Sequence, residues 1–301
     1  MRLHLSFARS RALIELMEIT SPSNPKIKHV VKLRNRRERD LSGEMIVEGY
    51  RECVRALDCG YVPRAIFHCP EMYLKNENEA ALVERCVSLG ADAYTCSKIC
   101  FEKIAYKERP DGLLMTGPHV AVKLKDLSLP ENALVIVTEG VEKPGNLGTI
   151  LRSADAAGAA AVIVCDRVTD VHNPNVVRAS TGALFSVPVA EASSEEAIEF
   201  LKEHSFSILA ASPHAEKLHF EADLTGPVAV ALGAEQYGLT AKWMDGANLR
   251  VRIPMLGLSD SLNVSAAATI LVHEAVRQRI ASGRVKVPDF IPWHGEGKID
   301  H

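Results

Sequence analysis

Residues 133–165 read ALVIVTEGVEKPGNLGTILRSADAAGAAAVIVC, and this stretch decides the fold class. It opens with the apolar run Ala133–Thr138, which is typical of a strand buried on both faces of a parallel sheet. A helical segment over Leu147–Ala157 follows, and a second apolar strand comes at Ala160–Cys165. A strand, a helix and a strand in this order predict a parallel βαβ unit.

The alternation of strands and helices continues as far as residue 281. The pattern predicts strands at Val187–Val189, Phe206–Ala210, Pro227–Leu232 and Asn248–Ile253, and helices at Pro174–Thr181, Ser194–His204 and Leu262–Ala281. Residues 133–281 are therefore predicted to form an α/β domain around a doubly wound parallel sheet. Ligands bind to such sheets beyond the carboxyl ends of the strands, so the loops at that edge are the candidate functional segments.

A smaller α/β domain is predicted over residues 21–122. The pattern indicates strands at Met45–Val47 and Arg64–Cys69, a helix at Glu79–Leu89, and a pair of strands in Leu113–Val122 broken at Gly117 and Pro118. Residues 123–132 have no clear period and are predicted to be a linker. We interpret residues 1–20 as an N-terminal extension and residues 282–301 as a C-terminal tail.

The composition is that of a soluble protein. The chain has 301 residues, is 47% hydrophobic and carries a formal charge of −3, which suggests about two domains. The longest apolar stretch, Ala156–Cys165, is too short to cross a membrane, and the first residues lack the apolar core of a signal peptide. The seven cysteines are odd in number and lack C-x-x-C spacing, which favours reduced thiols in a cytoplasmic protein without a metal centre.

The first candidate loop, residues 142–152, reads EKPGNLGTILR. Gly145 and Gly148 permit tight backbone turns, Asn146 can cap the helix or fix the loop, and Arg152 lies close enough to the strand ends to reach a ligand. A plain turn with a helix cap and a surface arginine is the alternative. The loop is neither a phosphate-binding P-loop nor the G-x-G-x-x-G dinucleotide fingerprint, so nucleotide hydrolysis and hydride transfer lose their usual support.

The second candidate loop, residues 232–239, reads LGAEQYGL. Gly233 and Gly238 flank Glu235, a carboxylate at the carboxyl edge of a buried strand. A carboxylate at such a place must be solvated, hydrogen-bonded or paired with a cation. The alternative is a simple turn that ends the strand.

The third candidate loop and the helix start after it, residues 253–268, read IPMLGLSDSLNVSAAA. Pro254 ends a strand because it cannot donate to the ladder. Four polar residues then gather where the last helix begins: Ser259, Asp260, Ser261 and Asn263. A helix needs one such residue as its cap, so this crowding favours ligand binding over capping alone.

A basic segment, residues 26–39, lies in the N-terminal part of the chain and reads KIKHVVKLRNRRER. Residues 1–55 hold 12 Lys and Arg against 7 Asp and Glu, whereas the remainder holds 23 against 31. This density of cations fits the neutralisation of nucleic-acid phosphates, and a solvated helix face is the alternative. The predicted RNA-binding residues are Lys26, Lys28, Lys32, Arg34, Arg36, Arg37 and Arg39.

Three segments in order resemble the three motifs of the SpoU/TrmH family of SPOUT RNA methyltransferases: KPGNLGTILRSADAAGA from Lys143, ALGAEQYGL from Ala231 and IPMLGLSDSLNVSAAATILVHEA from Ile253. RASTGALFSVPV from Arg178 is similar to the middle segment of the family. The upstream segment GEMIVEGYRECVRAL resembles, more loosely, the ribosomal-protein L30e-like RNA-binding domain that precedes the catalytic domain in many members.

The resemblance implies S-adenosylmethionine as methyl donor and a ribose 2′-OH of RNA as acceptor. It also implies a deep trefoil knot in the C-terminal half and a homodimer with the active site near its interface. An added N-terminal RNA-binding domain fits members that act on large-subunit rRNA, so rRNA is the favoured substrate. A tRNA 2′-O-methyltransferase and a non-catalytic RNA-binding or ribosome-assembly protein on the same fold remain the alternatives.

The resemblance also assigns the site residues. The matching catalytic positions are Asn146, Arg152, Glu235, Ser261 and Asn263, and the matching cofactor-binding positions are Leu232, Gly233, Gly238, Ile253, Met255, Gly257 and Leu262. In the family the arginine is a candidate general base, but a guanidinium is almost wholly protonated at pH 7. We therefore expect Arg152 to bind RNA phosphate and orient the hydroxyl, with Ser261 and Asn263 positioning it.

Two histidines in the catalytic half offer themselves as alternative bases. We interpret His172 as a loop or capping residue and His273 as a residue packed in the last helix or at a dimer interface.

Overall fold

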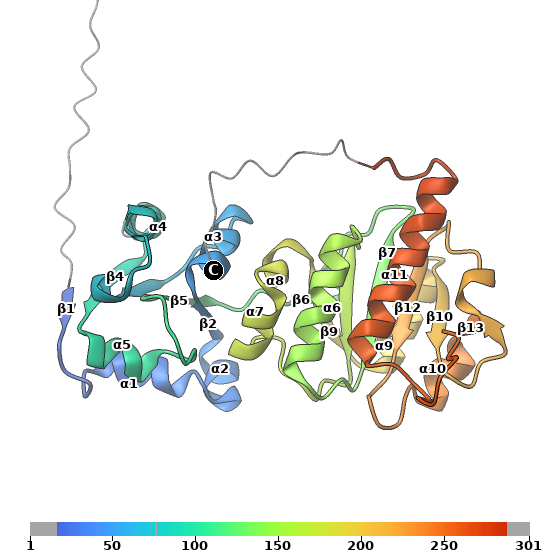
Figure 1. Ribbon diagram of the computed structural model, residues 1–301, viewed down its shortest axis with the longest axis horizontal. Coiled ribbons are helices and arrows are strands. Elements are labelled where there is room, and N and C mark those ends of the chain that lie inside the picture. The colour runs from blue at the N-terminus through green and yellow to red at the C-terminus, as the bar shows by residue number, and fades with distance from the viewer. Residues whose placement is uncertain (1–16, 76, 288–301) are drawn as a thin grey trace, which may run out of the picture.

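The computed structural model describes residues 17–75 and 77–287, and within them the chain forms two sheets that lie side by side (Figure 1). The predicted extension and tail fall largely outside the described residues, although Met17–Ile19 form strand β1. All seven cysteines are described and unpaired, and six of them are buried. None of the helices within the described ranges is long and apolar enough to span a membrane.

The first sheet is mixed, and its described strands run in the order β1-β4-β3-β5-β2. The strands are β1 Met17–Ile19, β2 Glu44–Glu48, β3 Ala65–His68, β4 Asp92–Cys96 and β5 Leu113–Pro118. Its helices are α1 Pro25–Lys32, α2 Arg36–Ser42, α3 Tyr50–Asp58, α4 Glu77–Ser88 and α5 Lys98–Ile104. Strand β5 is antiparallel to both β2 and β3, whereas β4 is parallel to β1 and β3.

The second sheet is parallel in every described pair, as the sequence predicted. Its order is β11-β13-β10-β12-β7-β8-β9-β6. The strands are β6 Val122–Lys123, β7 Leu134–Glu139, β8 Ala161–Cys165, β9 Val189–Ala192, β10 Ser207–Ala211, β11 Lys217–Leu218, β12 Val228–Leu232 and β13 Leu249–Arg252. The helices are α6 Pro144–Ala156, α7 Pro174–Ser180, α8 Ala183–Ser186, α9 Ser194–Glu203, α10 Ala241–Gly246 and α11 Val264–Ala281.

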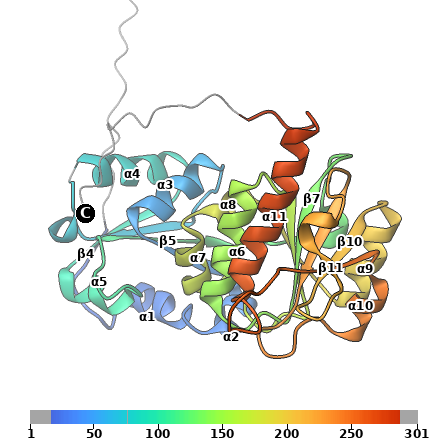
Figure 2. The ribbon, with the colours of Figure 1, turned by 45° about the vertical axis from the view of Figure 1, so that its right-hand side comes forward.

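The strand order places a topological switch point between β7 and β12. From β7 the chain proceeds outward through β8 and β9, and it then returns to build β10, β12 and β13 on the other side of β7. Helices α6 and α11 cover one face of the sheet, while α9 and α10 cover the other (Figures 1 and 2). The alternation in β7 follows these layers, because Leu134 and Ile136 pack on the first face and Val135 and Val137 on the second.

Two predicted boundaries are corrected by proline chemistry. The strand expected at Val187–Val189 begins at Val189, because Pro188 has no N–H and the amide of Val187 still bonds back to the carbonyl of Ala183. The strand pair expected in Leu113–Val122 is one strand in each sheet. Strand β5 runs through Pro118 at its end, and β6 joins the edge of the second sheet beside β9.

The junction between the two sheets is held by a buried ion pair, and this corrects the role predicted for Arg39. The Arg39 side chain is 1% exposed, and its Nε donates to Asp170 Oδ2 at 2.9 Å. Its Nη1 donates to the carbonyls of Leu33 and Arg34 at 2.7 and 2.9 Å. Because the guanidinium is enclosed and its donors are engaged, Arg39 cannot bind RNA phosphate and instead fastens α2 to the loop after β8.

A pair of stacked histidines lies at the same junction. The rings of His119 and His172 are 3.9 Å apart at their centroids and nearly parallel. His172 Nε2 accepts hydrogen bonds from the amides of Val120 and Ala121 at 3.2 and 3.3 Å. Burial and the neighbouring His119 lower the pKa of His172 to about 3, so its ring is neutral. The interpretation of His172 as a structural loop residue is confirmed.

Candidate active site

The three loops singled out in the sequence meet at the carboxyl edge of the second sheet. The first loop leaves β7 and the second leaves β12, and these two strands are neighbours at the switch point. The third loop connects β13 to α11, and Asn263 at its end donates from Nδ2 to Asn146 Oδ1 at 3.1 Å. Asn146 lies in the first turn of α6, where Lys143 is the N-cap, so Asn146 does not cap this helix. Ligands of open α/β sheets bind at this kind of position.

A chain of hydrogen bonds joins one polar residue from each loop. Asn146 Nδ2 donates to Glu235 Oε1 at 2.5 Å, and Asn263 Nδ2 donates to Asn146 Oδ1. The backbone amide of Glu142 donates to Glu235 Oε2 at 3.3 Å. Three of the five predicted catalytic residues are thus brought together, although they lie up to 117 residues apart in the chain.

Asn263 caps the last helix and also contacts the first loop. Its Oδ1 accepts from the amide of Ser265 at 3.0 Å and from Ser265 Oγ at 2.6 Å, which is a helix cap. Its Nδ2 is the donor to Asn146. An asparagine offers an acceptor and a donor on one amide, so a single residue satisfies both interpretations made from the sequence.

The Glu235 carboxylate is ionised at neutral pH. Partial burial alone would raise the pKa of Glu235, but the hydrogen bonds from Asn146 and from nearby backbone amides outweigh it and lower the pKa. The site therefore holds a fixed negative charge at the end of the Glu235–Asn146–Asn263 chain.

Arg152 and Ser261 lie outside this chain of hydrogen bonds. Arg152 is exposed on α6, and its guanidinium has no hydrogen-bond or ion-pair partner in the part of the chain that the structure describes. Ser261 is exposed on the third loop, where its hydroxyl donates to Asp260 Oδ1 at 3.2 Å. A free guanidinium is available to an anionic ligand, whereas one already paired is not.

Helix α6 holds Arg152 on a rigid support. A Cβ at Gly148 would lie 2.5 Å from Cβ of Ala179, so α6 packs against α7 at a distance that requires glycine. On its other side, Ser153 Oγ lies 2.7 Å from Thr269 Oγ1 of α11. Arg152 is the ninth residue of α6, more than two turns from the helix start, and its position is set by these two neighbouring helices.

The second loop is a tight turn that needs both of its glycines. A Cβ at Gly233 would lie 2.0 Å from the carbonyl carbon of Gly238, and Gly238 itself has φ of +70°. The amide of Gly238 donates to the carbonyl of Ala234 at 2.9 Å and closes the turn. Leu232, the residue before it, is buried at the end of β12.

The chemistry of the third loop fits S-adenosylmethionine. Ile253 and Met255 are half-buried, Gly257 and Leu262 are exposed, and Leu256 and Leu258 present their full apolar surface. No backbone amide of residues 255–262 donates a hydrogen bond to any of the described residues. Apolar side chains beside free peptide donors suit the face and the edge of an adenine ring.

A second observation at the switch point supports the same fit. Thr138 Oγ1 is buried and has no hydrogen-bond partner among the described residues. It lies one residue before the end of β7, directly opposite Leu232 in β12. A buried hydroxyl without a partner is rare and is often found at functional sites.

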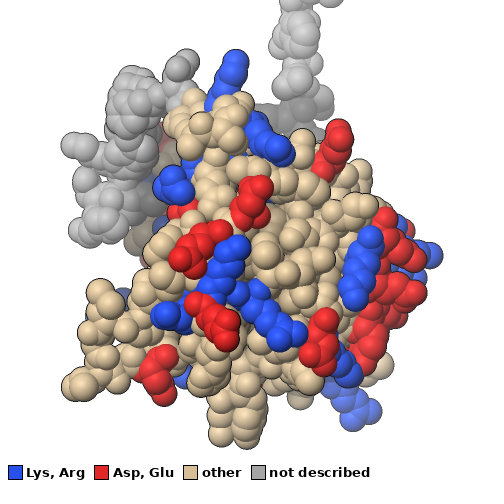
Figure 3. All heavy atoms as spheres, turned by 90° about the vertical axis from the view of Figure 1, so that its right-hand side faces the viewer, with Lys and Arg blue, Asp and Glu red and all other residues tan. Residues whose placement is uncertain are grey.

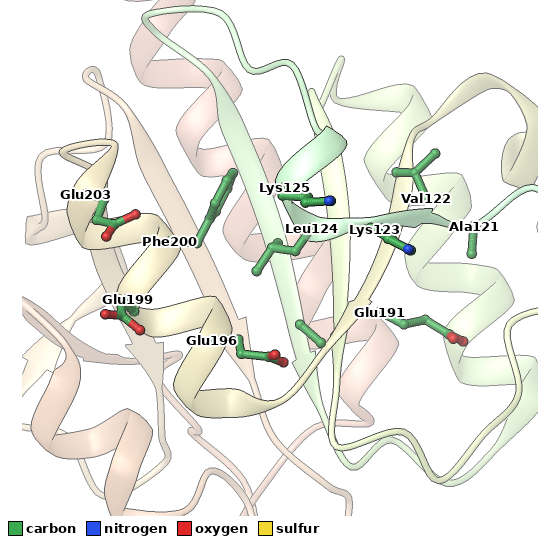
Figure 4. Close-up of a pocket in the computed structure, with 11 residues that line it drawn as sticks. Ala121, Val122, Lys123, Leu124, Lys125, Glu191, Glu196, Glu199, Phe200 and Glu203 are labelled. Carbon is green, nitrogen blue, oxygen red and sulfur yellow. The ribbon is translucent and has the colours of Figure 1, made fainter.

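A hollow on the surface of the second domain is not this site. It has a volume of about 760 Å³ and lies between the β6 segment, β9 and α9. Figure 4 shows Glu196, Glu199 and Glu203 projecting from α9 on one side and Lys123 and Lys125 opposite. Glutamates outnumber lysines in its lining and would repel phosphate, and none of the residues of the three loops contributes to it.

The predicted RNA-binding segment lies next to the loops. Arg36 Nη1 of α2 donates to the carbonyl of Val168 at 3.3 Å, which ties this helix to the loop that leaves β8 at the same edge. Lys26 lies over the ring of Tyr94, and Arg34 donates to the carbonyls of Lys103 and Ala105.

Three further cations of this segment are free. The side chains of Lys28, Lys32 and Arg37 are exposed and have no polar partner within residues 17–75 and 77–287. By contrast, the face at the β13 end of the second sheet mixes acidic and basic side chains (Figure 3).

The sequence analysis missed one buried carboxylate at this edge, Glu139. It ends β7 with 4% of its surface exposed and accepts from Thr240, the residue after the second loop. A charged residue at the end of an otherwise apolar strand is the sequence signal that could have identified it.

Comparisons with known proteins identify the family of the chain. Residues 133–273 match the model of the SpoU rRNA Methylase family, and residues 24–115 match that of an MRM3-like substrate binding domain. The chain is 31% identical over 262 residues to a 23S rRNA (uridine(2479)-2′-O)-methyltransferase of Streptomyces viridochromogenes, covering 85% of this chain and 90% of that protein.

Two solved structures are similar over most of the chain. One is an RNA 2′-O ribose methyltransferase with 39% identity and a TM-score of 0.76, which covers 88% of this chain and 100% of that one. The other is an AdoMet-bound rRNA methyltransferase from Sinorhizobium meliloti with 28% identity and a TM-score of 0.81, covering 87% and 98%. The chain belongs to the SpoU rRNA methylase family.

Proposed function

We propose that this protein is an S-adenosylmethionine-dependent methyltransferase that methylates a ribose 2′-OH of large-subunit rRNA. The observation that carries the proposal is the Glu235–Asn146–Asn263 chain, which joins all three family motifs at the switch point of the sheet. The relative from Streptomyces, whose name gives 23S rRNA as its substrate, matches this chain across both domains, and this favours rRNA over tRNA.

The second and third loops would hold the cofactor through Leu232, Gly233, Gly238, Ile253, Met255, Gly257 and Leu262. When bound, S-adenosylmethionine supplies a methyl group on a sulfonium that already is a good leaving group, so no metal is needed for this step. The backbone amides of residues 255–262 donate no hydrogen bond to the described residues and would be available to the cofactor.

The catalytic roles follow from placement and charge. Arg152 is cationic and free, so it binds an RNA phosphate and orients the attacking hydroxyl. Ser261 and Asn263 position that hydroxyl from the third loop. Glu235 holds Asn146, and through it Asn263, in one orientation.

The RNA-binding surface extends from the basic segment to the catalytic edge. Lys28, Lys32 and Arg37 provide free cations, and Lys26, Arg34 and Arg36 flank them. Because α2 contacts the loop after β8, a bound RNA strand could pass from α1 and α2 to Arg152 without leaving the protein surface. We keep the division into an RNA-binding domain at 21–122, a linker at 123–132 and a catalytic domain at 133–281 as part of this proposal, together with a cytoplasmic location beside its substrate.

A homodimer and a trefoil knot complete the proposal. Tyr237, Leu256, Leu258 and Ile270 expose apolar surface around the site, and a second copy of the chain could cover it. His273 lies exposed on the same helix as Ile270. The third loop starts at β13 and reaches the first loop beside β7, so it must cross the ends of β10 and β12. A trefoil knot requires a crossing of this kind.

Mass spectrometry of nucleosides tests the function directly. Ribosomal RNA and tRNA from cells with and without the gene are digested and compared for 2′-O-methylated nucleosides. We expect one 2′-O-methyl position in large-subunit rRNA to be lost without the gene and restored by it. Loss in tRNA instead would support the tRNA alternative, and unchanged methylation in both RNAs would favour a non-catalytic RNA-binding protein.

A further inference from the structure

Glu139 is a buried carboxylate at the point where the first two loops meet. It is the last residue of β7, it is 4% exposed, and it lies three residues before the first loop. No lysine or arginine forms an ion pair with it among the described residues. The carboxylate is therefore held only by neutral hydrogen-bond donors. Burying a carboxylate in this way costs free energy unless the donors are well placed.

The carboxylate accepts two hydrogen bonds from Thr240, the residue immediately after the second loop. Glu139 Oε2 accepts from the amide of Thr240 at 2.7 Å, and Oε1 accepts from Thr240 Oγ1 at 2.7 Å. Two charge-assisted hydrogen bonds to a single residue fix both its backbone and its side chain. The exit of the second loop is thus tied to the strand from which the first loop starts.

The contact does not serve the helix that begins there. Thr240 is the N-cap of α10, where a threonine hydroxyl normally accepts from a helix amide. Here the side chain makes no cap hydrogen bond, and its hydroxyl donates to Glu139. The Thr240 side chain therefore does not cap α10, and it holds the end of the second loop to Glu139.

A rigid platform supports the anchor. Ser194 Oγ lies 3.1 Å from Glu139 Oε1 and 2.5 Å from Asp166 Oδ2, and it accepts from Trp243 Nε1 at 2.8 Å. Trp243 is fully buried in α10. The second loop is thus attached at three places: at its start by β12, at Glu235 by Asn146, and at its end by the contact of Thr240 with Glu139.

We propose that Glu139 is a positioning residue for cofactor binding, which it serves by holding the second loop in its binding shape through Thr240. The proposal rests on the function proposed above. A loop that must be ordered at the moment of binding loses affinity, whereas a pre-ordered loop does not. The prediction is a defect in cofactor affinity that leaves the chemical step and RNA affinity intact.

The test is calorimetric titration of the full-length protein with S-adenosylmethionine, combined with steady-state kinetics. Glu139→Gln preserves the size of the side chain but turns an amide NH₂ toward the donors of Thr240. We expect the Kd and KM for the cofactor to rise about tenfold or more. The kcat at saturating cofactor and the KM for RNA should stay within about twofold of the unchanged protein.

Two threonine variants test the same contact without altering the buried charge. Thr240→Val removes the hydroxyl and keeps the amide, so a rise of a few-fold in the cofactor Kd is expected, whereas Thr240→Ser keeps the hydroxyl and should restore it. Asp166→Asn is the matched control, because Asp166 contacts the same Ser194 but not Thr240. It should leave the cofactor Kd within twofold.

Circular dichroism should first show that Glu139→Gln and Thr240→Val are folded. Unchanged cofactor affinity in both folded variants would overturn this inference alone. An equal fall in kcat and in both affinities would overturn it as well, since that is the mark of general unfolding. Absence of binding to the unchanged protein would instead overturn the proposed function, and this inference with it.

Discussion

The carboxyl edge of the second sheet and the junction between the two sheets are built alike but differ in burial. Each joins segments more than 80 residues apart through side-chain hydrogen bonds. At the edge, Glu235 and Asn263 are exposed and Arg152 has no partner among the described residues. At the junction, Arg39 and Asp170 are 1% and 4% exposed, and they are paired with each other.

The difference shows that burial, and not residue type, decides which charges can meet a ligand. Burial alone would raise the pKa of Asp170, but the hydrogen bonds and charge of Arg39 outweigh it and lower the pKa. That pair stabilises the arrangement of the two domains. An exposed guanidinium without a partner among the described residues, such as that of Arg152, leaves its donors available to an anionic ligand.

The largest expected effect is at the edge. Arg152→Ala should lower methyl transfer about 1000-fold or more, because it removes the cation that we propose to bind and orient the RNA. The cofactor Kd and the free energy of unfolding should change little, since the side chain is exposed and its guanidinium has no polar partner among the described residues. Near-normal methylation by this variant would rule out the role given to Arg152.

At the junction, Asp170→Asn should reduce the free energy of unfolding by about 3–5 kcal/mol, because it leaves Arg39 buried without a counter-charge. Denaturant unfolding measures this loss. The control is Asp40→Asn, which weakens the ion pairs of the exposed Asp40 with Arg36 and Arg167 and should cost less than about 1 kcal/mol. Equal losses in the two variants would contradict the distinction between buried and exposed pairs.

Asn146→Ala separates activity from stability. It breaks both hydrogen bonds of the chain at the edge, so kcat should fall about 100-fold while unfolding changes little. Asn173→Ala is the reverse control, since Asn173 caps α7 by accepting from the amide of Asn175. Its loss should cost about 1 kcal/mol of stability and leave kcat unchanged. A parallel loss of activity and stability in both variants would argue against the separation.

Acid should weaken the junction through its histidine. His172 takes up a proton only near pH 3 in the folded protein, whereas an unfolded histidine does so near pH 6.5. Between these values the unfolded chain binds more protons, so stability present above pH 6.5 is lost as the pH falls. His68, whose pKa burial lowers to about 4, acts in the same direction.

Denaturant unfolding across pH 4 to 6 measures this effect. His172→Gln keeps an acceptor for the amides of Val120 and Ala121 and should reduce the slope by about 1.4 kcal/mol per pH unit. The exposed His214→Gln is the control and should leave the slope unchanged. A slope that His172→Gln does not alter would show that the ring titrates normally.

The smallest effects belong to the basic segment. Lys28→Ala, Lys32→Ala and Arg37→Ala should each weaken RNA binding several-fold and reduce the slope of log affinity against log salt by about one. Lys242→Ala, at the far end of the second domain, should change neither. RNA-binding titrations at several salt concentrations provide both numbers. Equal sensitivity to Lys242→Ala would mean that the RNA lies elsewhere.

Much of the second domain could be predicted because its strands are buried on both faces. Apolar runs such as Ala133–Thr138 and Ala160–Cys165 are typical of strands that are covered on both faces of a parallel sheet. Strand β4, Asp92–Cys96, was missed because its letters DAYTC mix polar and apolar residues, and its burial comes from neighbouring strands distant in sequence.

At the site, the motifs predicted a set of catalytic residues but not which of them contact one another. Asn146, Glu235 and Asn263 could be grouped only once the strand order was known, because the loops meet through the topology of the sheet. Arg39 looked like its basic neighbours, and its burial depends on the docking of one domain on the other. The contact of Glu139 could not be predicted from the sequence, because its partner Thr240 follows it by 101 residues.

The most direct test of the account is transfer of a labelled methyl group in vitro. The purified protein is incubated with S-adenosylmethionine labelled in its methyl group and with ribosomal RNA that lacks the modification, and the digested nucleosides are separated. The account predicts label on the ribose 2′-oxygen of one nucleotide of large-subunit rRNA, and none with Arg152→Ala. Label on a base, or no label in rRNA with the unchanged protein, would contradict it.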